Sequence, residues 1–207
     1  MLKFQEMPKH LLFDFGVVLI PIDQSLSYDA FEKLGAREEL AQQNELFEKL
    51  ERGDLNNDEF LKSIQPFFFR KNIFKKDLAE AWNAMCYAPI PEENIQLLKK
   101  LCRNHSLYLV SNTNAMHIQK IKDLCGPFKY KQFTSLFEHV YYSHEMGSRK
   151  PEAAFFKKVL KEQKLDPADC LFIDDREENV KAAKKLGIQT KLFNPEKVEL
   201  KELVFSS

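Results

Sequence analysis

The sequence predicts an α/β fold, a parallel sheet with helices on both faces and an added helical part. Short apolar runs alternate with segments of helical periodicity over most of the chain, which is typical of strands joined by helical crossovers. Polar residues, several of them acidic, stand at the carboxyl ends of these runs. One stretch, residues 25–87, has helical patterns only, which indicates an insertion into the alternating pattern.

Five apolar runs are predicted to be strands. They are residues 10–15, 107–111, 139–143, 170–174 and 188–193. Helical patterns separate most of them, at residues 91–102, 115–125, 151–164 and 179–186. Pro91 and Pro151 suit the first turn of a helix, and Gly126 and Gly187 end the other two helices. Such alternation predicts parallel strands with right-handed connections.

The insertion is predicted to consist of four helices. Their limits are residues 25–34, 37–52, 57–65 and 77–86. Gly35 and Gly53 follow the first two patterns, and Pro66 follows the third. The inserted segment therefore separates the first strand from the rest of the sheet.

Composition excludes several classes of partner. The chain has 207 residues, of which 44% are hydrophobic and 30% charged, the profile of a globular protein. Lys plus Arg total 31, as do Asp plus Glu, so the formal net charge is zero. A neutral chain offers no electrostatic reason to bind nucleic acid or an anionic membrane. We therefore expect a small-molecule partner and, as the simplest state, a monomer.

The sequence contains no pattern typical of a membrane span or a signal peptide. Its longest apolar stretch, residues 11–22, is too short to cross a bilayer and includes Asp14 and Pro21. The four cysteines show no CxxC spacing. We expect them to be buried free thiols, which predicts a cytoplasmic protein.

The ends of the predicted strands carry the candidate site. Ligands of open parallel sheets bind beyond the carboxyl ends of the strands. The residues at or after these ends are Asp14, Ser111, Asn112, Thr113, Lys150, Asp174 and Asp175. Carboxylates without sulfur ligands suit a hard cation, and Mg²⁺ is the usual choice beside phosphate.

Each of these residues also has an ordinary structural interpretation. Asp14 alone could cap a turn, and Lys150 could be surface charge. Ser111 could cap the helix that follows it, although Asn114 competes for that position. Adjacent carboxylates at Asp174 and Asp175 repel each other unless a cation or water separates them. The combination of all these residues favours a functional site.

Four motifs in order resemble the haloacid dehalogenase (HAD) superfamily. They are FDFGVV around Asp14, LVSNTN around Ser111, SRKP around Lys150, and FIDDREEN around Asp174 and Asp175. ERGD at 51–54 and SHEMGSRKPE at 143–152 resemble the subgroup that includes alpha-D-glucose-1-phosphate phosphatases. The resemblance implies a subfamily I hydrolase with a Rossmann-like core, residues 1–20 and 92–207, and a helical C1 cap, residues 21–91. It also implies a five-stranded parallel sheet in the order 5-4-1-2-3.

The resemblance assigns a role to each motif residue. Asp14 is the implied nucleophile, which forms an aspartyl phosphate. Ser111 and backbone amides near Asn112 would hold the phosphoryl oxygens, while Lys150 would neutralise charge on both the phosphoryl group and Asp14. Arg52 and Glu51 of the cap are candidate substrate contacts, although a charged helix end is their ordinary interpretation.

A magnesium ion is the implied cofactor. Its ligands would come from Asp14, the backbone carbonyl of Gly16, and the pair Asp174 and Asp175. We favour Asp175 as the direct ligand, because Asn179 lies four residues later in the register of the family. Asp174 would then act through water.

Gly16 departs from most phosphatases of the superfamily, which have a second aspartate there as general acid and base. Such a group typically contributes about 10²–10⁴ in rate. Three interpretations stay open: substrates with easier leaving groups, a substitute side chain such as Asp23 or His144, or weak or lost activity. The resembled subgroup also has glycine here. We therefore expect a magnesium-dependent phosphatase of small phosphorylated metabolites, with hexose 1-phosphates favoured.

Three alternatives remain at this stage. Haloacid dehalogenation on the same fold needs no magnesium. Phosphonate hydrolysis requires a cap lysine, for which Lys49 is the only candidate. A non-catalytic HAD-like binding protein would explain Gly16, but not the presence of the other motif residues.

Overall fold

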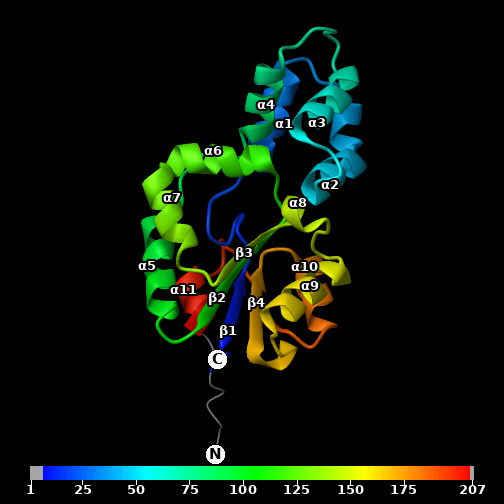
Figure 1. The fold of residues 1–207 in the computed structure, drawn as a ribbon. Coiled ribbons are helices and arrows are strands. Elements are labelled where there is room, and N and C mark those ends of the chain that lie inside the picture. Colours follow the sequence, from blue (N-terminus) through cyan, green and yellow to red (C-terminus); the bar gives the residue numbers. More distant parts are fainter. Residues whose placement is uncertain (1–6, 206–207) are drawn as a thin grey trace, which may run out of the picture.

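A parallel sheet of five strands forms the centre of the molecule. The computed structural model describes residues 7–205, and Figure 1 shows its arrangement. The strands are β1 (His10–Phe13), β2 (Ser106–Ser111), β3 (His139–Tyr142), β4 (Cys170–Asp174) and β5 (Gln189–Leu192). Their spatial order is β3-β2-β1-β4-β5, which confirms the predicted order 5-4-1-2-3 counted from the opposite edge.

The register of the sheet places the candidate residues together. Phe13 of β1 lies between Leu109 of β2 and Ile173 of β4. The next residue, Asp14, donates its backbone N–H to the carbonyl of Ile173 at 2.9 Å. Since all three strands run in the same direction, their carboxyl ends form one edge, where polar side chains from separate segments meet.

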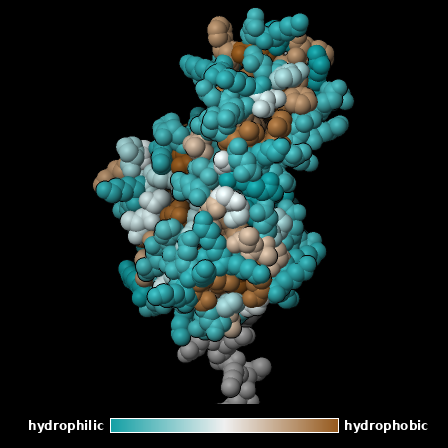
Figure 2. All heavy atoms as spheres, turned by 45° about the vertical axis from the view of Figure 1, so that its right-hand side comes forward, coloured by the Kyte–Doolittle hydropathy of each residue, from teal (hydrophilic) through white to brown (hydrophobic). Residues whose placement is uncertain are grey.

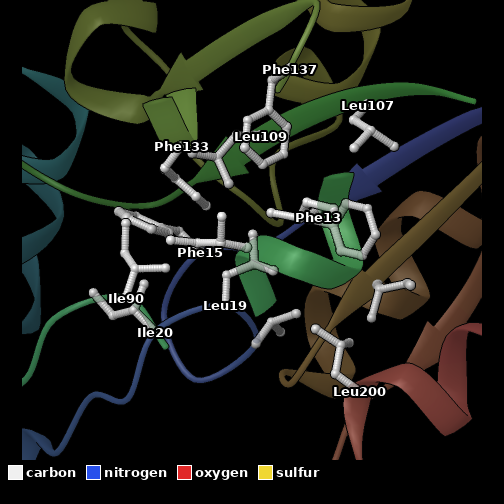
Figure 3. Close-up of a cluster of buried hydrophobic side chains, with 14 of the residues drawn as sticks. Phe13, Phe15, Leu19, Ile20, Ile90, Leu107, Leu109, Phe133, Phe137 and Leu200 are labelled. Carbon is white, nitrogen blue, oxygen red and sulfur yellow. The ribbon is translucent and has the colours of Figure 1, made fainter. Parts of the chain in front are cut away.

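Helices cover both faces of this sheet (Figure 1). One side has α5 (Glu92–Leu101), α6 (Ala115–Cys125), α7 (Pro127–Thr134) and α11 (Leu200–Phe205), and the other has α9 (Ala153–Gln163) and α10 (Glu177–Lys184). Successive strand residues alternate between the faces. Leu11 and Phe13 belong to the first apolar cluster, part of which is drawn in Figure 3, and Leu12 belongs to the second.

A separate helical lobe stands above the carboxyl ends of the strands (Figure 1). It consists of α1 (Gln24–Lys33), the 3-10 turn η1 (Glu38–Gln42), α2 (Asn44–Arg52), α3 (Asn57–Ile64), η2 (Gln65–Phe67) and α4 (Lys75–Asn83). The lobe has its own apolar cluster, which includes Phe31, Phe60 and Trp82. Met116 of α6 joins this cluster, so one helix of the sheet domain supports the lobe. The face in Figure 2 is mostly hydrophilic over both parts, with small apolar patches.

Local capping explains where several lobe helices begin. Asp23 accepts a hydrogen bond from the N–H of Ser25 at 2.9 Å and caps α1. Asn56 and Glu59 form a reciprocal capping box at the start of α3. Gly53, with φ of 78°, ends α2 in the left-handed conformation that glycine adopts readily.

Several features differ from expectation, among them the helix α8 (Ser143–Met146), which was not predicted. The helix predicted for residues 37–52 is divided into η1 and α2, because the side-chain amide of Gln43 donates to the carbonyl of Glu39 at 3.0 Å. This bond competes with the backbone bond of a continuous helix. Helix α7 was not predicted, although Pro127 occupies its first turn. Cys86 and Cys170 are buried as expected, but Cys102 is exposed and Cys125 is only half-buried. Within residues 7–205, no helix is long and apolar enough to span a bilayer.

Candidate active site

Four charged side chains meet at the carboxyl ends of β1 and β4. Carboxylate oxygens of Asp14, Asp174 and Asp175 all lie within 4.8 Å of one another. The ammonium of Lys150 donates to Oδ1 of Asp14 at 2.5 Å and to Oδ2 of Asp174 at 2.7 Å. Lys150 is only 1% exposed, so these contacts are shielded from bulk water. The structure therefore brings together three residues proposed as metal ligands and the proposed catalytic lysine.

Asn112 holds the backbone of Lys150 in place. Its Oδ1 accepts from the N–H of Lys150 at 2.8 Å, and its Nδ2 donates to the carbonyl of Lys150 at 2.7 Å. The Asn112 side chain is thus engaged, which leaves the backbone as the part of this residue able to bind phosphate. Ser111 is buried and lines the cavity, while Asn114 caps α6 by accepting from the N–H of His117. Ser111 is therefore not needed as a helix cap.

The two adjacent aspartates have different surroundings. Asp174 is fully buried. Its Oδ2 accepts from Lys150 and its Oδ1 from the N–H of Arg176, and the amide of Asn179 donates to both oxygens. Asp175 is partly exposed and lines the cavity. This difference favours Asp175 over Asp174 as a direct ligand of a metal ion.

The cluster has an excess of negative charge. Burial raises the pKa of Asp14 to about 7, Lys150 acts to lower it, and the charge of Asp174 acts to raise it. Burial and Asp174 also raise the pKa of Asp175. One ammonium cannot balance three carboxylates in a buried site, and a divalent cation would supply the missing charge.

The donor set fits a hard cation. The group consists of carboxylate oxygens, which suit Mg²⁺. Oδ1 of Asn179 is buried and has no hydrogen-bond partner among the described residues, so it is available to a water of a hydrated ion. The carbonyl of Gly16 accepts from the N–H of Val18 at 2.6 Å. A carbonyl oxygen has a second lone pair, so this bond leaves Gly16 able to serve as a ligand.

A cavity of about 750 Å³ lies between the lobe and the sheet domain. The sheet domain lines it with the polar residues Asp14, Ser111, Asn112, Thr113, His117, Arg149, Lys150, Asp175, Arg176, Glu178 and Asn179. The lobe lines it with Gln24, Ser27, Tyr28, Phe31, Asn44, Phe47, Glu48, Glu51 and Trp82. A volume of this size suits a small organic molecule.

Arg52 is placed differently from the other predicted site residues. Its guanidinium binds Glu152 at 2.7 Å and Glu48 at 3.1 Å, and it is not among the described residues that line the cavity. Arg149 and Arg176 line it instead. The arginine next to Lys150, not the one in the lobe, therefore faces the cavity.

His117 is a cavity residue that the sequence did not single out. Its Nε2 lies 3.2 Å from the carbonyl of Trp82, and its Nδ1 lies 3.1 Å from the side-chain amide of Asn114. A neutral ring that donates from Nε2 satisfies both partners. Burial lowers the pKa of His117 to about 4, which agrees with the neutral form. The ring also stacks on Trp82, with centroids 4.9 Å apart.

Comparison with known proteins agrees with this geometry. The family model described as haloacid dehalogenase-like hydrolase matches residues 8–187. The chain is a haloacid dehalogenase-like hydrolase. The match spans both the lobe and the four motifs at the strand ends, so lobe and sheet domain belong to one family unit.

Relatives of this HAD-like hydrolase include proteins of similar length. The D-ribitol-5-phosphate phosphatase of Bacteroides thetaiotaomicron is 29% identical over 198 residues, which cover 92% of this chain and 93% of that protein. A HAD family enzyme of the same organism, solved with magnesium and inorganic phosphate, has a TM-score of 0.80 and 35% identity, covering 89% of this chain and 93% of that one. A predicted HAD-like family hydrolase of Porphyromonas gingivalis has a TM-score of 0.74 and 28% identity, covering 90% of this chain and 91% of that one.

Two polar cavity residues of this HAD-like hydrolase, Glu48 and Arg149, were not identified from the sequence, whereas Glu51 was a candidate substrate contact and does line the cavity. The ERGD and SRKP motifs contain Glu51 and Arg149, but nothing in the sequence indicates that these motifs touch. Contact across a domain junction has no periodic signal, because the segments are far apart in the chain.

Proposed function

We propose that this protein is a magnesium-dependent phosphatase that hydrolyses small phosphate monoesters through Asp14. The observation that carries the proposal is the cluster of Asp14, Lys150, Asp174 and Asp175 beside a cavity of about 750 Å³ between the lobe and the sheet domain. In this proposal residues 1–20 and 92–207 form the core domain, and residues 21–91 form the cap over the site. The phosphatase relative and the neighbour solved with magnesium and phosphate support it.

Each side chain has a defined part in the proposed reaction. One oxygen of Asp14 attacks phosphorus, the bond to the ester oxygen breaks, and the alcohol departs with a proton from solvent. Lys150 offsets negative charge on Asp14 and on the phosphoryl group, and the hydroxyl of Ser111 donates to a phosphoryl oxygen. Bound Mg²⁺ supplies further charge neutralisation and orients the phosphoryl group. Water then hydrolyses the aspartyl phosphate and regenerates Asp14.

The lobe residues that line the cavity favour a substrate that is neutral and carries hydroxyls in the part away from its phosphate. The lobe contributes two carboxylates, Glu48 and Glu51, together with amide and hydroxyl groups. Among the described lobe residues, none that lines the cavity is Lys, Arg or His. Both glutamates are paired with Arg149, and the described residues of the lobe offer no free cation at the cavity to a second phosphate or a carboxylate, whereas sugar hydroxyls would find acceptors and donors. We therefore propose a monophosphate of a small sugar or sugar alcohol.

Gly16 favours good leaving groups within that class. Neither Asp23 nor His144 lines the cavity, within the part of the chain that is described. Asp23 caps α1, and the Nδ1 of His144 lies 3.2 Å from the carbonyl of Thr113. Without a proton donor at position 16, departure of a weakly acidic alcohol is slow. An anomeric alcohol is more acidic than a primary one, so a hexose 1-phosphate is the favoured substrate.

The test compares kcat/KM for glucose 1-phosphate, glucose 6-phosphate, ribitol 5-phosphate and fructose 1,6-bisphosphate, with magnesium and with excess EDTA. We expect magnesium-dependent release of phosphate, with the 1-phosphate ahead of both primary esters and the bisphosphate slowest. A preference for ribitol 5-phosphate would overturn the leaving-group argument but not phosphatase activity. Phosphate release undiminished in EDTA, or chloride release from 2-chloropropionate, would contradict the proposed function.

The other two alternatives have less support in the structure. Lys49, the candidate for phosphonate chemistry, forms an exposed ion pair with Glu45 at 2.7 Å and is not among the described residues that line the cavity. A binding protein without catalysis would not need Lys150 held between two carboxylates. Both alternatives predict an absence of phosphate release from every ester in the panel.

A further inference from the structure

A network of ion pairs joins the lobe to the loop that carries Lys150. Arg149 Nε donates to Glu51 at 2.7 Å, and Arg149 Nη1 lies 3.2 Å from Glu48. Arg52 lies 3.1 Å from the other oxygen of Glu48 and binds Glu152 at 2.7 Å. Both lobe glutamates and Arg52 belong to α2, and Arg149 and Glu152 flank Lys150 and Pro151 in the sheet domain.

The network closes on itself through the backbone. Glu152 accepts from Arg52 with Oε1, and its Oε2 lies 3.4 Å from the N–H of Arg149. Glu48 connects Arg52 to Arg149 on the lobe side. Arg149, Glu48, Arg52 and Glu152 therefore form one cycle across the junction, and Glu51 is attached to it through Arg149. Such cycles hold each side chain with more than one partner.

The pair formed by Arg149 and Glu51 is the most shielded part of the network, and it is less exposed than the ion pairs within the lobe. The side chain of Arg149 is 10% exposed and that of Glu51 is 25% exposed. By contrast, Lys75 and Asp58, which pair within the lobe, are 47% and 66% exposed. Exposed pairs contribute roughly 0–1 kcal/mol, whereas removal of one partner from a shielded pair leaves a charge without compensation. The contact at Arg149 therefore has more influence on the junction than its neighbours do.

Lys150 is held on two sides by contacts of different origin. On the sheet side, Asn112 binds both its N–H and its carbonyl. On the lobe side, the preceding residue Arg149 is bound by Glu48 and Glu51. If the lobe shifts, Glu48 and Glu51 move with it, and Arg149, the residue before Lys150, loses its partners or is displaced with them. Lys150 in turn must reach both Asp14 and Asp174.

We propose that Arg149 is a positioning residue, which couples the seating of the lobe to the placement of Lys150 beside Asp14. This inference rests on the proposed function, in which Lys150 offsets charge on the reacting groups. It assigns to the ERGD and SRKP motifs a shared task, contact with each other across the junction. The glutamates of the lobe act on catalysis through Arg149, and Arg149 acts through Lys150.

The inference predicts an effect on turnover rather than on substrate affinity. An aryl phosphate with a small ring makes few contacts with the lobe, so its KM depends little on the lobe residues that line the cavity. For this substrate, Arg149→Met should lower kcat by about 10–100-fold, as expected when a catalytic group is misplaced by up to about 1 Å. The KM should change by less than about threefold. Arg149→Lys keeps the positive charge but loses the two-point hydrogen bonding of the guanidinium. Its kcat should therefore lie between those of Arg149→Met and the wild type.

A double-mutant cycle separates coupling from independent effects. Glu51→Gln is nearly isosteric and should lower kcat in the same direction as Arg149→Met. The double variant should be no slower than Arg149→Met alone, because both changes break the same link. Lys75→Met, which breaks an exposed ion pair within the lobe, serves as the control and should keep wild-type kcat. Thermal unfolding of every variant checks that the fold is retained.

Three results would contradict a positioning role for Arg149. An increase in KM with unchanged kcat in Arg149→Met would make Arg149 a substrate contact. Additive losses in the double variant would show that Glu51 and Arg149 act separately. If Arg149→Met does not fold, the isosteric Glu51→Gln decides the matter, and wild-type kcat in that variant overturns the proposal. Absence of phosphatase activity in the wild type would instead sink the proposed function itself, so the two failures are distinguishable.

Discussion

Gly53 is the position at which a single added methyl group should separate the lobe from the sheet domain. Its φ is 78°, and a Cβ built on its backbone would lie 2.2 Å from the carbonyl oxygen of His144. A carbon–oxygen contact normally needs about 3.3 Å. The missing separation of roughly 1 Å cannot come from a side-chain rotation, because the obstructing atom belongs to the backbone of α8 (Ser143–Met146). The lobe must therefore move.

Gly35 provides a matched control for Gly53→Ala. It also lies in the lobe with a positive φ, 87°, but a Cβ there would meet nothing within 4 Å. Both alanine variants incur the left-handed strain of about 1–2 kcal/mol. For a chain of this size each kcal/mol lowers Tm by about 2–4 °C. Only Gly53→Ala adds the displacement of the lobe.

Activity should therefore distinguish the two variants. A displacement of about 1 Å at a catalytic junction can reduce the rate by about 10²-fold. We expect Gly53→Ala to lower kcat/KM by about that factor, and Gly35→Ala to stay within about threefold of wild type. The assay is phosphate release at 25 °C, with thermal unfolding of both variants measured to show that each is folded at that temperature. Equal activity of the two variants, whether both normal or both reduced, would refute the reasoning.

Three further predictions follow from the site. Asp14→Asn should reduce phosphate release by about 10⁴-fold or more with little change in Tm, since the amide is nearly isosteric but not nucleophilic; substantial residual turnover would exclude Asp14. Asp175→Ala should raise the magnesium concentration needed for half-maximal activity at least tenfold, and an unchanged requirement in a titration would assign the metal elsewhere. The unfolding free energy should fall by about 2 kcal/mol between pH 7 and pH 5 through His117, because its folded pKa of about 4 lies below its unfolded value near 6.5. Stability from a lowered pKa is present above the unfolded value and is lost as the pH falls toward the folded one. The unfolding free energy of His117→Gln, measured with urea, should change by about 2 kcal/mol less between pH 7 and pH 5 than that of the wild type.

The parts of the fold that depend on local pattern were predictable. The strand at Cys170–Asp174 has the limits expected from its apolar run, and the strand order agrees with the family resemblance. Pro127, in contrast, directly follows the helix that is predicted to end at Gly126, and the pattern does not show that this proline begins a second helix, α7. The local sequence is compatible with proline either ending one helix or beginning the next, and packing against neighbouring elements determines which occurs.

The site was predictable only where a residue follows a strand. Asp14, Ser111 and Asp174 are placed by the sheet register, which a sequence pattern indicates. Arg149 and Glu51 are 98 positions apart and meet through a domain junction, for which no periodicity exists. His117 is similar: its helical pattern places it in α6, but its partner Trp82 belongs to another domain. Residues of this kind require the three-dimensional arrangement.

The lobe is attached to the sheet domain by two contacts of unlike chemistry. On the α6 side, Met116 packs into the apolar cluster of the lobe and His117 stacks on Trp82. On the α2 side the contact is ionic. Salt screens charge pairs that are accessible to solvent, while salts such as sulfate strengthen apolar burial. A salt such as sulfate should therefore strengthen the α6 contact while it screens the more exposed members of the ionic contact, Glu48 and Glu152, whose side chains are 39% and 34% exposed. The two sides of the lobe thus respond to the same salt in opposite directions.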